Sequence, residues 1–376
     1  MATSSFSNLP SPKQILLSPF LSGPLLLYLT KINPDIVSKI PWPPERSIIT
    51  LPFSLPFGIP NQIPIRADPP VKALKALFGL GLILYLNRFF NRLALNYGHL
   101  KKQGTPWDFQ TEGKETIIIT GGCSGFGKEM VKQFATQTKA KILVLDIQEL
   151  PEELKDIPRL TYYQIDLSSP ESIKSVVSTV LAEHRPTVLI NNAGIAQAHT
   201  ILDTTDEFLD KIFRINVTSH FTLIRLLLPR FMSQSKGHIV TIASMASYTG
   251  TASLADYSAT KAAVLGMHES LLQELAHRHQ DQGGHTIQAS IIHPLWARTP
   301  LIGSWETQLT RSGESVMTAE FVAAGVVKQV LGGRSGSVYL PEHNWNVVFM
   351  RAVPTWLAFL VQGKVQRATN TGQSKK

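Results

Sequence analysis

The stretch TIIITGGCSGFG, residues 116–127, decides the fold that we expect for this chain. It begins with a short β-branched run, typical of a buried strand, and continues into a turn with glycines at positions 121, 125 and 127. A helical pattern follows over residues 128–138. Glycines in this setting let the backbone turn tightly and approach a pyrophosphate at the start of a helix. The stretch therefore predicts a strand, turn and helix that bind a dinucleotide.

Six further strand patterns follow this unit, over residues 141–146, 161–166, 187–191, 238–243, 286–293 and 337–340. Short runs rich in Ile and Val, separated by helical patterns, predict a parallel sheet that helices cover on both faces. We therefore expect an α/β domain of the Rossmann type, a doubly wound parallel sheet, over residues 115–340.

Composition and charge limit the class of protein. The chain of 376 residues is long enough for one large α/β domain with extensions. Its single cysteine, Cys123, excludes an intrachain disulfide framework and a cysteine-based zinc site, so we expect no metal. The net charge of +9 comes from the flanks: residues 1–115 hold 12 Lys/Arg against 6 Asp/Glu, and residues 341–376 hold 5 against 1. Basic flanks beside apolar runs favour a membrane surface over nucleic acid, which would need a basic face on the folded domain.

Residues 1–70 are predicted to form a proline-rich, apolar arm. They hold 14 of the 24 prolines, and proline at this density breaks helices and interior strands, so we expect no independent domain. The apolar run 14–30 is interrupted by Pro19 and Pro24 and does not resemble an ordinary signal peptide. A transit peptide, or an arm that packs on the domain or on lipid, stays open.

Residues 71–97 are predicted to form a membrane-type helix. Its uncharged stretch, 76–87, spans roughly 18 Å, less than the ~30 Å of a hydrocarbon core. Snorkelling of the flanking Lys and Arg side chains would let residues 71–90 just cross. A hairpin with the run 14–30 and a buried amphipathic helix are the alternatives. Residues 98–114 are then expected to be a polar linker.

The C-terminal residues 341–376 are predicted to be an apolar, amphipathic extension. Within them, residues 347–361 carry one charge, Arg351, and two aromatic anchors, Trp356 and Phe359. This stretch could cap the core, form a homodimer contact or lie in a bilayer interface.

Residues at the strand ends are candidates for binding the cofactor. Asp146 ends the second strand, 19 residues after Gly127, where a carboxylate accepts hydrogen bonds from ribose hydroxyls and repels a 2′-phosphate. No arginine directly follows it, which favours NAD over NADP; a surface aspartate that merely closes a strand is the alternative. The other candidates of this kind are Gly121, Ser124, Gly125, Phe126, Gly127, Asp166, Leu167, Asn192, Ala193 and Gly194.

A candidate acid–base pair lies in the stretch SMASYTGTASLADYSATK, residues 244–261. Tyr257 and Lys261 are four residues apart, so on a helix they share one face. The ammonium would favour phenolate and lower a phenol pKa of about 10, which suits a general acid or base near neutral pH. Taken alone, the spacing also fits an ordinary solvated pair.

Together these pieces resemble the short-chain dehydrogenase/reductase superfamily over about residues 115–340. The resemblance rests on TGGCSGFG (120–127), Asp146, NNAG (191–194), Asn216, Ser244 and YSATK (257–261). It implies that Tyr257 is the catalytic acid/base and that Lys261 lowers its pKa and holds the nicotinamide ribose. It also implies that Ser244 binds the substrate oxygen and that Asn216 anchors a water that relays protons. Ser247 is a rival for the serine role, but its spacing to Tyr257 does not fit the family.

The same resemblance gives a role to two residues that follow the sixth strand. It implies that Pro294 and Thr299 lie beside the nicotinamide, as parts of the cofactor site. The glycine that usually follows the proline is absent here, where Leu295 stands, and this puts the shape of the loop in doubt.

A membrane-type helix followed by Trp107-Asp108 and the glycine turn is similar to the microsomal and lipid-droplet branch of the superfamily. That branch includes retinol and hydroxysteroid dehydrogenase relatives. The resemblance implies an NAD-dependent enzyme that interconverts a lipophilic alcohol (retinoid, steroid or long-chain) and its carbonyl. It further implies attachment to endoplasmic reticulum or lipid droplet, with the catalytic domain facing the cytosol. A ketoreductase that uses NADPH and a non-catalytic dinucleotide-binding scaffold are the alternatives.

Overall fold

The structure, a computed structural model, describes residues 17–32, 46–50, 62–66, 70–303, 305–311 and 313–366. The chain divides into two compact units, residues 1–94 and 95–376. Much of the proline-rich arm, including residues 1–16, and the end of the C-terminal extension, residues 367–376, lie outside the described residues.

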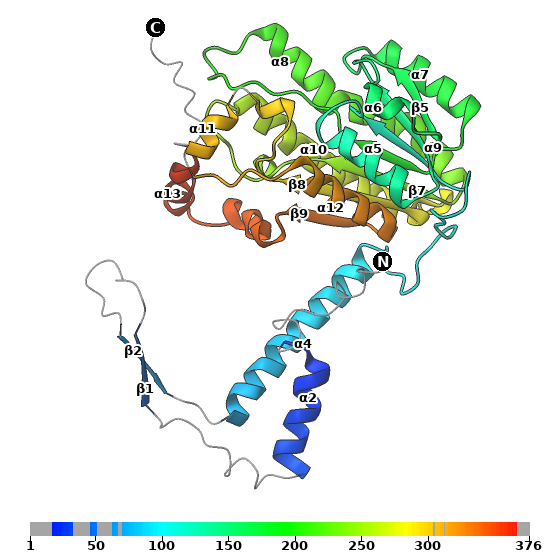
Figure 1. Cartoon of the computed structure of the whole chain (residues 1–376). Helices are drawn as coiled ribbons and strands as arrows, with labels where there is room; N and C mark the ends of the chain where they lie inside the picture. Colours follow the sequence, from blue (N-terminus) through cyan, green and yellow to red (C-terminus); the bar gives the residue numbers. More distant parts are fainter. Residues whose placement is uncertain are drawn as a thin grey trace. The chain divides into compact units, whose positions relative to one another are not determined.

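The second unit contains a seven-stranded parallel sheet (Figure 1). All five residues of the first strand are buried, which explains its uninterrupted β-branched run. The predicted doubly wound fold is confirmed, and the predicted strand ends differ from the observed ones by at most two residues. The strands are β3 (Thr116–Thr120), β4 (Lys141–Asp146), β5 (Leu160–Gln164), β6 (Val188–Asn191), β7 (Gly237–Ile242), β8 (Ile287–Pro294) and β9 (Gly336–Leu340).

Helices cover both faces of this sheet (Figure 1). Met130 of α5 and Val326 of α12 pack on one face, and Val177 of α7, Leu227 of α9 and Val264 of α10 pack on the other. The helices are α5 (Gly125–Gln137), α6 (Glu152–Lys155), α7 (Pro170–Glu183), α8 (Asp206–Phe213), α9 (Ser219–Ser233), α10 (Ala255–His277), α11 (Glu306–Arg311), α12 (Ala319–Gly332) and α13 (Thr355–Gln366). A π-helix, η3 (Arg214–Thr218), joins α8 to α9, and the 3₁₀ segments are η4 (Met245–Ser247), η5 (Gln280–Gln282), η6 (Gly284–Thr286), η7 (Pro300–Ile302) and η8 (Glu342–Arg351).

The strand order locates the crevice of the fold. The order is β5-β4-β3-β6-β7-β8-β9, so the chain runs outward from β3 to β5 and then returns to the other side of β3. In open parallel sheets, ligands bind at the carboxyl ends of the strands where the order reverses. Here that point lies between β3 and β6, and β3 leads directly into the glycine turn.

The structure differs from the predicted linker over residues 98–114, because the second unit begins at residue 95. Trp107 and Phe109 stack with ring centroids 5.5 Å apart, and Phe109 belongs to the buried core. The hydroxyl of Tyr97 donates a hydrogen bond to the carbonyl of Ile287 over 2.9 Å. Polar residues, glycine and proline made this segment resemble a linker, whereas its aromatic residues attach it to the domain.

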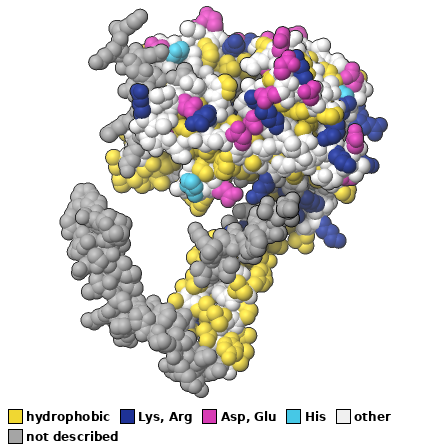
Figure 2. All heavy atoms as spheres, viewed as in Figure 1, with side chains coloured by type: hydrophobic (Ala, Val, Ile, Leu, Met, Phe, Trp, Pro, Cys, Tyr) yellow, Lys and Arg dark blue, Asp and Glu magenta, His cyan; other side chains and the backbone are white. Residues whose placement is uncertain are grey.

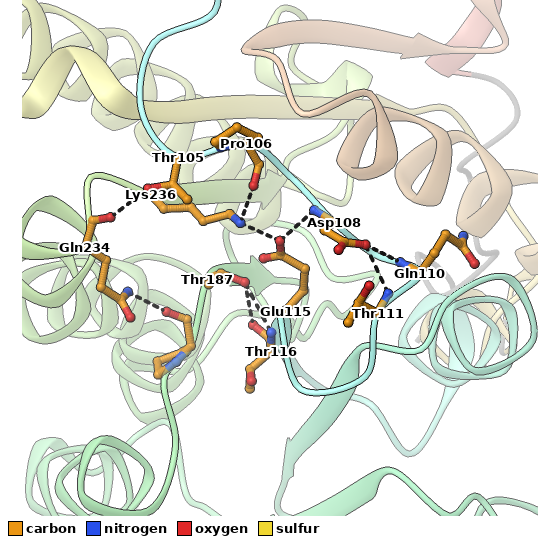
Figure 3. A network of polar contacts seen from close by, with 11 residues as sticks. Thr105, Pro106, Asp108, Gln110, Thr111, Glu115, Thr116, Thr187, Gln234 and Lys236 are labelled. Carbon is orange, nitrogen blue, oxygen red and sulfur yellow. Dashed lines mark hydrogen bonds and ion pairs between the residues drawn. The ribbon is translucent and has the colours of Figure 1, made fainter.

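Polar contacts also fasten this segment at the amino ends of the strands (Figure 3). Lys236, just before β7, forms a buried ion pair with Glu115, just before β3. The same ammonium donates to the carbonyl of Pro106 over 2.7 Å, and Glu115 accepts from the backbone N–H of Asp108 over 2.9 Å. This edge of the sheet lies opposite the glycine turn, so the network holds the fold rather than the crevice.

We expect Lys236→Met to lower the free energy of unfolding by about 3–5 kcal/mol, because it leaves the Glu115 carboxylate buried without its partner. Denaturant titration of the full chain in detergent, followed by tryptophan fluorescence, measures the loss. Lys128→Met is the matched control, since it breaks an exposed pair with Glu153 and should cost only about 0–1 kcal/mol. Equal losses in the two variants would contradict a stabilising role for the buried pair.

The described residues of the first unit form two packed helices and a pair of antiparallel strands. α4 (Pro70–Ala94) has 25 residues, which corresponds to roughly 37 Å. α2 (Pro19–Leu27) packs against it, with the rings of Phe20 and Tyr85 5.1 Å apart, and continues as the π-helix η1 (Tyr28–Ile32). A two-stranded antiparallel hairpin, β1 (Arg46–Thr50) and β2 (Gln62–Arg66), was not predicted, because prolines dominate this part of the sequence.

α4 has the length and composition of a membrane span over residues 71–94, with a hydropathy of 1.4 in its most apolar window. Only 6% of that window is buried, so the structure does not support the alternative of a buried amphipathic helix. Hydrophobic side chains run along the exposed surface of this helix (Figure 2). Contacts between α2 and α4 agree with the alternative of a hairpin between residues 14–30 and this helix, for the part of that run that the structure describes.

Candidate active site

A cavity of about 710 Å³ lies where the carboxyl ends of β3, β4, β6, β7 and β8 meet. Most of the site residues predicted from the sequence line it: Gly121, Ser124, Gly125, Phe126, Asp146, Asp166, Leu167, Asn192, Ala193, Gly194, Ser244, Tyr257, Lys261, Pro294 and Thr299. The two others, Gly127 and Asn216, lie behind its wall.

The glycine turn is shaped so that the backbone itself forms the cavity wall. Gly121 has φ +65°, and a Cβ there would lie 2.9 Å from the Cα of Ala193. At Gly127 a Cβ would lie 1.9 Å from the carbonyl oxygen of Gly121, so no side chain fits between turn and helix. Ser124 caps α5 without a side-chain hydrogen bond, and the first turn holds no acid. These first-turn amides and the helix dipole fit a pyrophosphate.

The carboxylate of Asp146 is held at the rim of this turn. Its Oδ2 accepts from the backbone N–H of Cys123 over 2.9 Å, and its Oδ1 accepts from that of Gln148 over 3.0 Å. Each oxygen keeps a lone pair for a further donor. Burial and the charge of Asp146 raise the pKa of the Cys123 thiol to about 12, so the thiol stays protonated at neutral pH.

The NNAG segment after β6 forms the next wall. The side-chain amide of Asn192 donates to the carbonyls of Thr120 and Gly121 over 2.9 and 3.1 Å. The backbone N–H of Ala193 donates to the hydroxyl of Thr120 over 3.1 Å. The segment is thereby locked to the glycine turn, which fixes the width of the crevice at the point where the strand order reverses.

Asn216 supports this wall from behind. It lies in the π-helix η3, and π-turns inside helices occur often at functional sites. Its amide accepts from the N–H of Ile195 and donates to the carbonyl of Ile195, both over 2.9 Å. A Cβ on Gly194 would lie 3.3 Å from Asn216 Oδ1 and 3.8 Å from Lys261 Nζ, so the asparagine and the lysine converge on Gly194.

Tyr257 and Lys261 share one face of α10, as their spacing predicts. The ammonium of Lys261 lies 5.4 Å from the centroid of the Tyr257 ring and donates to the carbonyl of Ile242 over 2.8 Å. Burial raises the pKa of Tyr257, and a hydrogen bond with Ser244 opposes this rise; the resulting pKa is about 12. Burial also lowers the pKa of Lys261 to about 8. The prediction of a lowered tyrosine pKa is therefore wrong for the protein groups alone. The cost of desolvating the phenolate is larger than the stabilisation that the neighbouring protein groups give it.

Ser244 is positioned by the backbone around it. It caps η4, and its hydroxyl accepts from the N–H of Ala246 over 3.1 Å. The imidazole Nδ1–H of His293 donates to the Ser244 carbonyl over 3.1 Å, and its ring stacks on Tyr339. Burial lowers the pKa of His293 to about 4, so the ring is neutral. His293 lies near the end of β8 and does not line the cavity.

A second buried histidine close to the site was not predicted from the sequence. His220 lies on α9, four residues after Asn216, and its side chain is almost completely buried. Burial lowers its pKa to about 3, and the positive charge of Lys261 lowers it further. The imidazole is therefore neutral beside the lysine. The four-residue spacing from Asn216 was the available signal, since it places both side chains on one helix face.

The far side of the cavity is largely apolar. A small hydrophobic cluster of Leu254, Ile302, Trp305 and Leu309 packs against Tyr257, and the first three residues line the cavity. The C-terminal extension contributes Asn344, Asn346, Val347, Met350, Val361 and Gln362. Of the three interpretations of residues 347–361, the structure thus supports capping of the domain. The low charge of these residues was the only feature of the sequence that indicated a role as a cavity wall.

Comparison with known proteins identifies relatives of this arrangement. The family model described as short chain dehydrogenase matches residues 115–309. Dehydrogenase RED2 of Cochliobolus heterostrophus is 31% identical over 57% of this chain and 80% of its own length. Human 17-beta-hydroxysteroid dehydrogenase 13 is 32% identical over 61% and 75%, and mouse epidermal retinol dehydrogenase 2 is 28% identical over 64% and 78%.

The fold has close counterparts among solved structures. A 4-hydroxyisoleucine dehydrogenase complexed with NADH superimposes with a TM-score of 0.53 at 25% identity, covering 60% of this chain and 96% of that one.

Proposed function

Because the chain belongs to the short chain dehydrogenase family, we propose that it is an NAD-dependent oxidoreductase that interconverts a lipophilic alcohol and its carbonyl. One observation carries the proposal: Ser244, Tyr257 and Lys261 line the same cavity as the glycine turn. The similarity to proteins named as hydroxysteroid and retinol dehydrogenases supports an alcohol of steroid, retinoid or long-chain type.

The residues of the crevice fit a dinucleotide. The turn over residues 121–127 and the start of α5 would hold its pyrophosphate, and Asp146 would accept hydrogen bonds from the adenosine ribose. Asp166 and Leu167 would flank the adenine, and residues 192–194 with Pro294 and Thr299 would border the nicotinamide. When bound, the nicotinamide supplies the hydride acceptor or donor.

The protein supplies orientation and the proton. In oxidation the Tyr257 phenolate accepts the hydroxyl proton of the alcohol, while the Ser244 hydroxyl holds the same oxygen. Lys261 gives one N–H to Ile242, which leaves two donors for the nicotinamide ribose and for stabilising the phenolate. Asn216 anchors a water that carries the proton onward. In reduction the same groups act in reverse.

The apolar far wall and the two helices of the first unit support a membrane setting. Leu254, Ile302 and Trp305 offer no charge to a polar substrate. α4 would anchor the chain to endoplasmic reticulum or lipid droplet, with the catalytic unit facing the cytosol. Turnover of retinoid, steroid and long-chain alcohols by the purified full chain with NAD⁺ or NADP⁺ tests the proposal. Absence of turnover across the panel would overturn it.

Asp146→Asn should lower the NAD⁺/NADP⁺ ratio of kcat/KM by about tenfold or more, because a charge-assisted hydrogen bond contributes about 1.5–3 kcal/mol and the repulsion of a 2′-phosphate is removed. The amide keeps the side-chain shape and one acceptor for the turn. Steady-state kinetics with each cofactor measures the ratio. Glu149→Gln is the control, because it removes one negative charge three residues away, outside the cavity. It should leave the NAD⁺/NADP⁺ ratio of kcat/KM unchanged. A ratio that favours NADP⁺ in the unmodified protein would contradict the role of Asp146.

A further inference from the structure

The C-terminal extension is a structural wall of the substrate cavity. η8 and α13 both supply lining residues, four from the first and two from the second. Arg351, at the end of η8, donates from its guanidinium to the carbonyl of Ser247 over 2.8 Å. The extension is therefore attached to the loop that follows Ser244, and whatever touches its outer side lies one layer away from the substrate.

The outer side of this wall is apolar and exposed. Its residues, which we call the C-terminal apolar surface, are Trp345, Phe349, Trp356, Phe359 and Leu360. Each is between 51% and 77% exposed. Trp345 and Phe349 pack edge to face with centroids 5.6 Å apart, so they present one continuous patch. Figure 2 shows hydrophobic side chains gathered on the part of the second unit where Figure 1 places α13.

We propose that the C-terminal apolar surface lies in a lipid surface, and that the substrate enters the cavity directly from the lipid through the wall formed by η8 and α13. The entry route rests on the lipophilic substrate of the proposed function, whereas the lipid contact does not depend on it.

Length and composition indicate an interfacial position. Residues 352–363 hold no charged side chain and include Trp356, whose amphipathic ring is favoured at the boundary between lipid and water. The 12 residues of α13 extend roughly 18 Å, less than the ~30 Å of a hydrocarbon core, so the helix cannot cross. A short helix with aromatic residues and basic neighbours is typical of one that lies in the interface plane.

Charge favours lipid over a second copy of this chain as the occupant. Residues 341–376 hold 5 Lys/Arg and 1 Asp/Glu. Self-association of this end of the chain would bring together two segments with the same excess of positive charge, which opposes a dimer through it. The anionic lipids of a cytosolic leaflet attract the same charges.

A fluorescent probe on the C-terminal apolar surface tests the lipid contact. The chain has one cysteine, Cys123, and it is buried, so Phe359→Cys adds a single accessible thiol for a polarity-sensitive dye. We expect its emission to shift to the blue and to be quenched when the full chain is reconstituted in vesicles of brominated phosphatidylcholine and phosphatidylserine. Glu152→Cys on α6 is the control, because its side chain is 88% exposed on another part of the same unit. It should show neither change.

The control also separates this contact from anchoring by the first unit, since both labelled proteins bind the vesicles through α2 and α4. Equal signals at the two positions would overturn the proposal. A blue-shifted dye at position 359 that brominated lipid does not quench would also overturn it, because protein, either a second copy or residues 17–94, would then cover the surface.

Kinetics tests the entry route. We expect Phe359→Asp with Leu360→Asp to raise KM for an alcohol dissolved in the vesicles by about tenfold, while KM for a water-soluble alcohol and for NAD⁺ stays unchanged. Phe221→Asp, an exposed position on α9, is the matched control and should change none of them. The same change in KM for both alcohols in the double variant, or no change for either, would refute entry from lipid. Failure of the protein to oxidise any alcohol would refute the proposed function and leave the probe result standing.

Discussion

Replacing Tyr257 by Phe should lower kcat for alcohol oxidation by about 10²–10⁴-fold, the usual contribution of a positioned general acid or base. The ring and its packing remain, and only the hydroxyl that exchanges a proton with the substrate is lost. KM for the nicotinamide cofactor should change little, because the cofactor is held mainly by the glycine turn and Asp146 in the proposed site. Single-turnover and steady-state assays with the full chain measure the effect.

The chain offers a matched control for this substitution. Tyr248 lies nine residues earlier, does not line the cavity, and places its hydroxyl 3.2 Å from that of Tyr339. Tyr248→Phe therefore removes the same atom outside the site and should leave kcat within about twofold, at a cost of about 1 kcal/mol in stability. Tyr257→Phe with unaltered turnover would refute the proposed chemistry.

The pH dependence of oxidation provides a second readout of the same proton transfer. Burial raises the pKa of Tyr257 to about 12, so its phenolate is scarce at neutral pH and increases about tenfold per pH unit. We expect kcat/KM for oxidation to rise with pH through the neutral and mildly alkaline range, and reduction, which uses the protonated phenol, to stay nearly level. The slope for oxidation should disappear in Tyr257→Phe.

Much of the fold and of the candidate site could be predicted from the sequence, because both follow local patterns. Parallel strands buried on both faces are continuous Ile/Val runs, as in residues 116–120, and such runs are visible without the structure. Positions at the carboxyl ends of those strands meet at one edge. This is why Asp146, Asn192 and Pro294 line one cavity although they are far apart in the sequence.

The parts that could not be predicted depend on long-range packing. Residues 98–114 resembled a linker, since the His238 ring beside Trp107 and the Lys236 side chain that pairs with Glu115 are supplied by a distant segment. The sequence of the C-terminal extension did not predict that it forms a wall of the cavity. The direction of the Tyr257 pKa shift was also wrong, because burial depends on the whole domain whereas the lysine four residues away is a local feature.

A set of buried histidines makes the stability of the catalytic unit depend on pH. His220, His238, His268 and His293 are each at most 2% exposed. Burial lowers their pKa values to about 3 for the first two and to about 4 for the others. Their rings stay neutral in the folded chain at pH values where an unfolded chain, with a histidine pKa of about 6.5, already binds protons.

Lowering the pH from 7.5 to 5.5 should therefore reduce the free energy of unfolding by about 1.4 kcal/mol for each of these histidines, or about 5–6 kcal/mol together. The sign follows from linkage: a depressed folded pKa gives stability that is complete above the unfolded value of about 6.5 and is lost as pH falls toward the folded value. Since the free energy of unfolding of a domain is only about 5–15 kcal/mol in total, the unit should approach unfolding near pH 5.

Urea titrations at the two pH values measure the loss of stability, and two variants on α10 assign it to the histidines. His268→Gln at a buried position should remove about 1.4 kcal/mol of the difference, whereas His277→Gln at an exposed position should remove none. The same pH dependence in all three proteins would mean that carboxylates, and not the buried imidazoles, control acid unfolding.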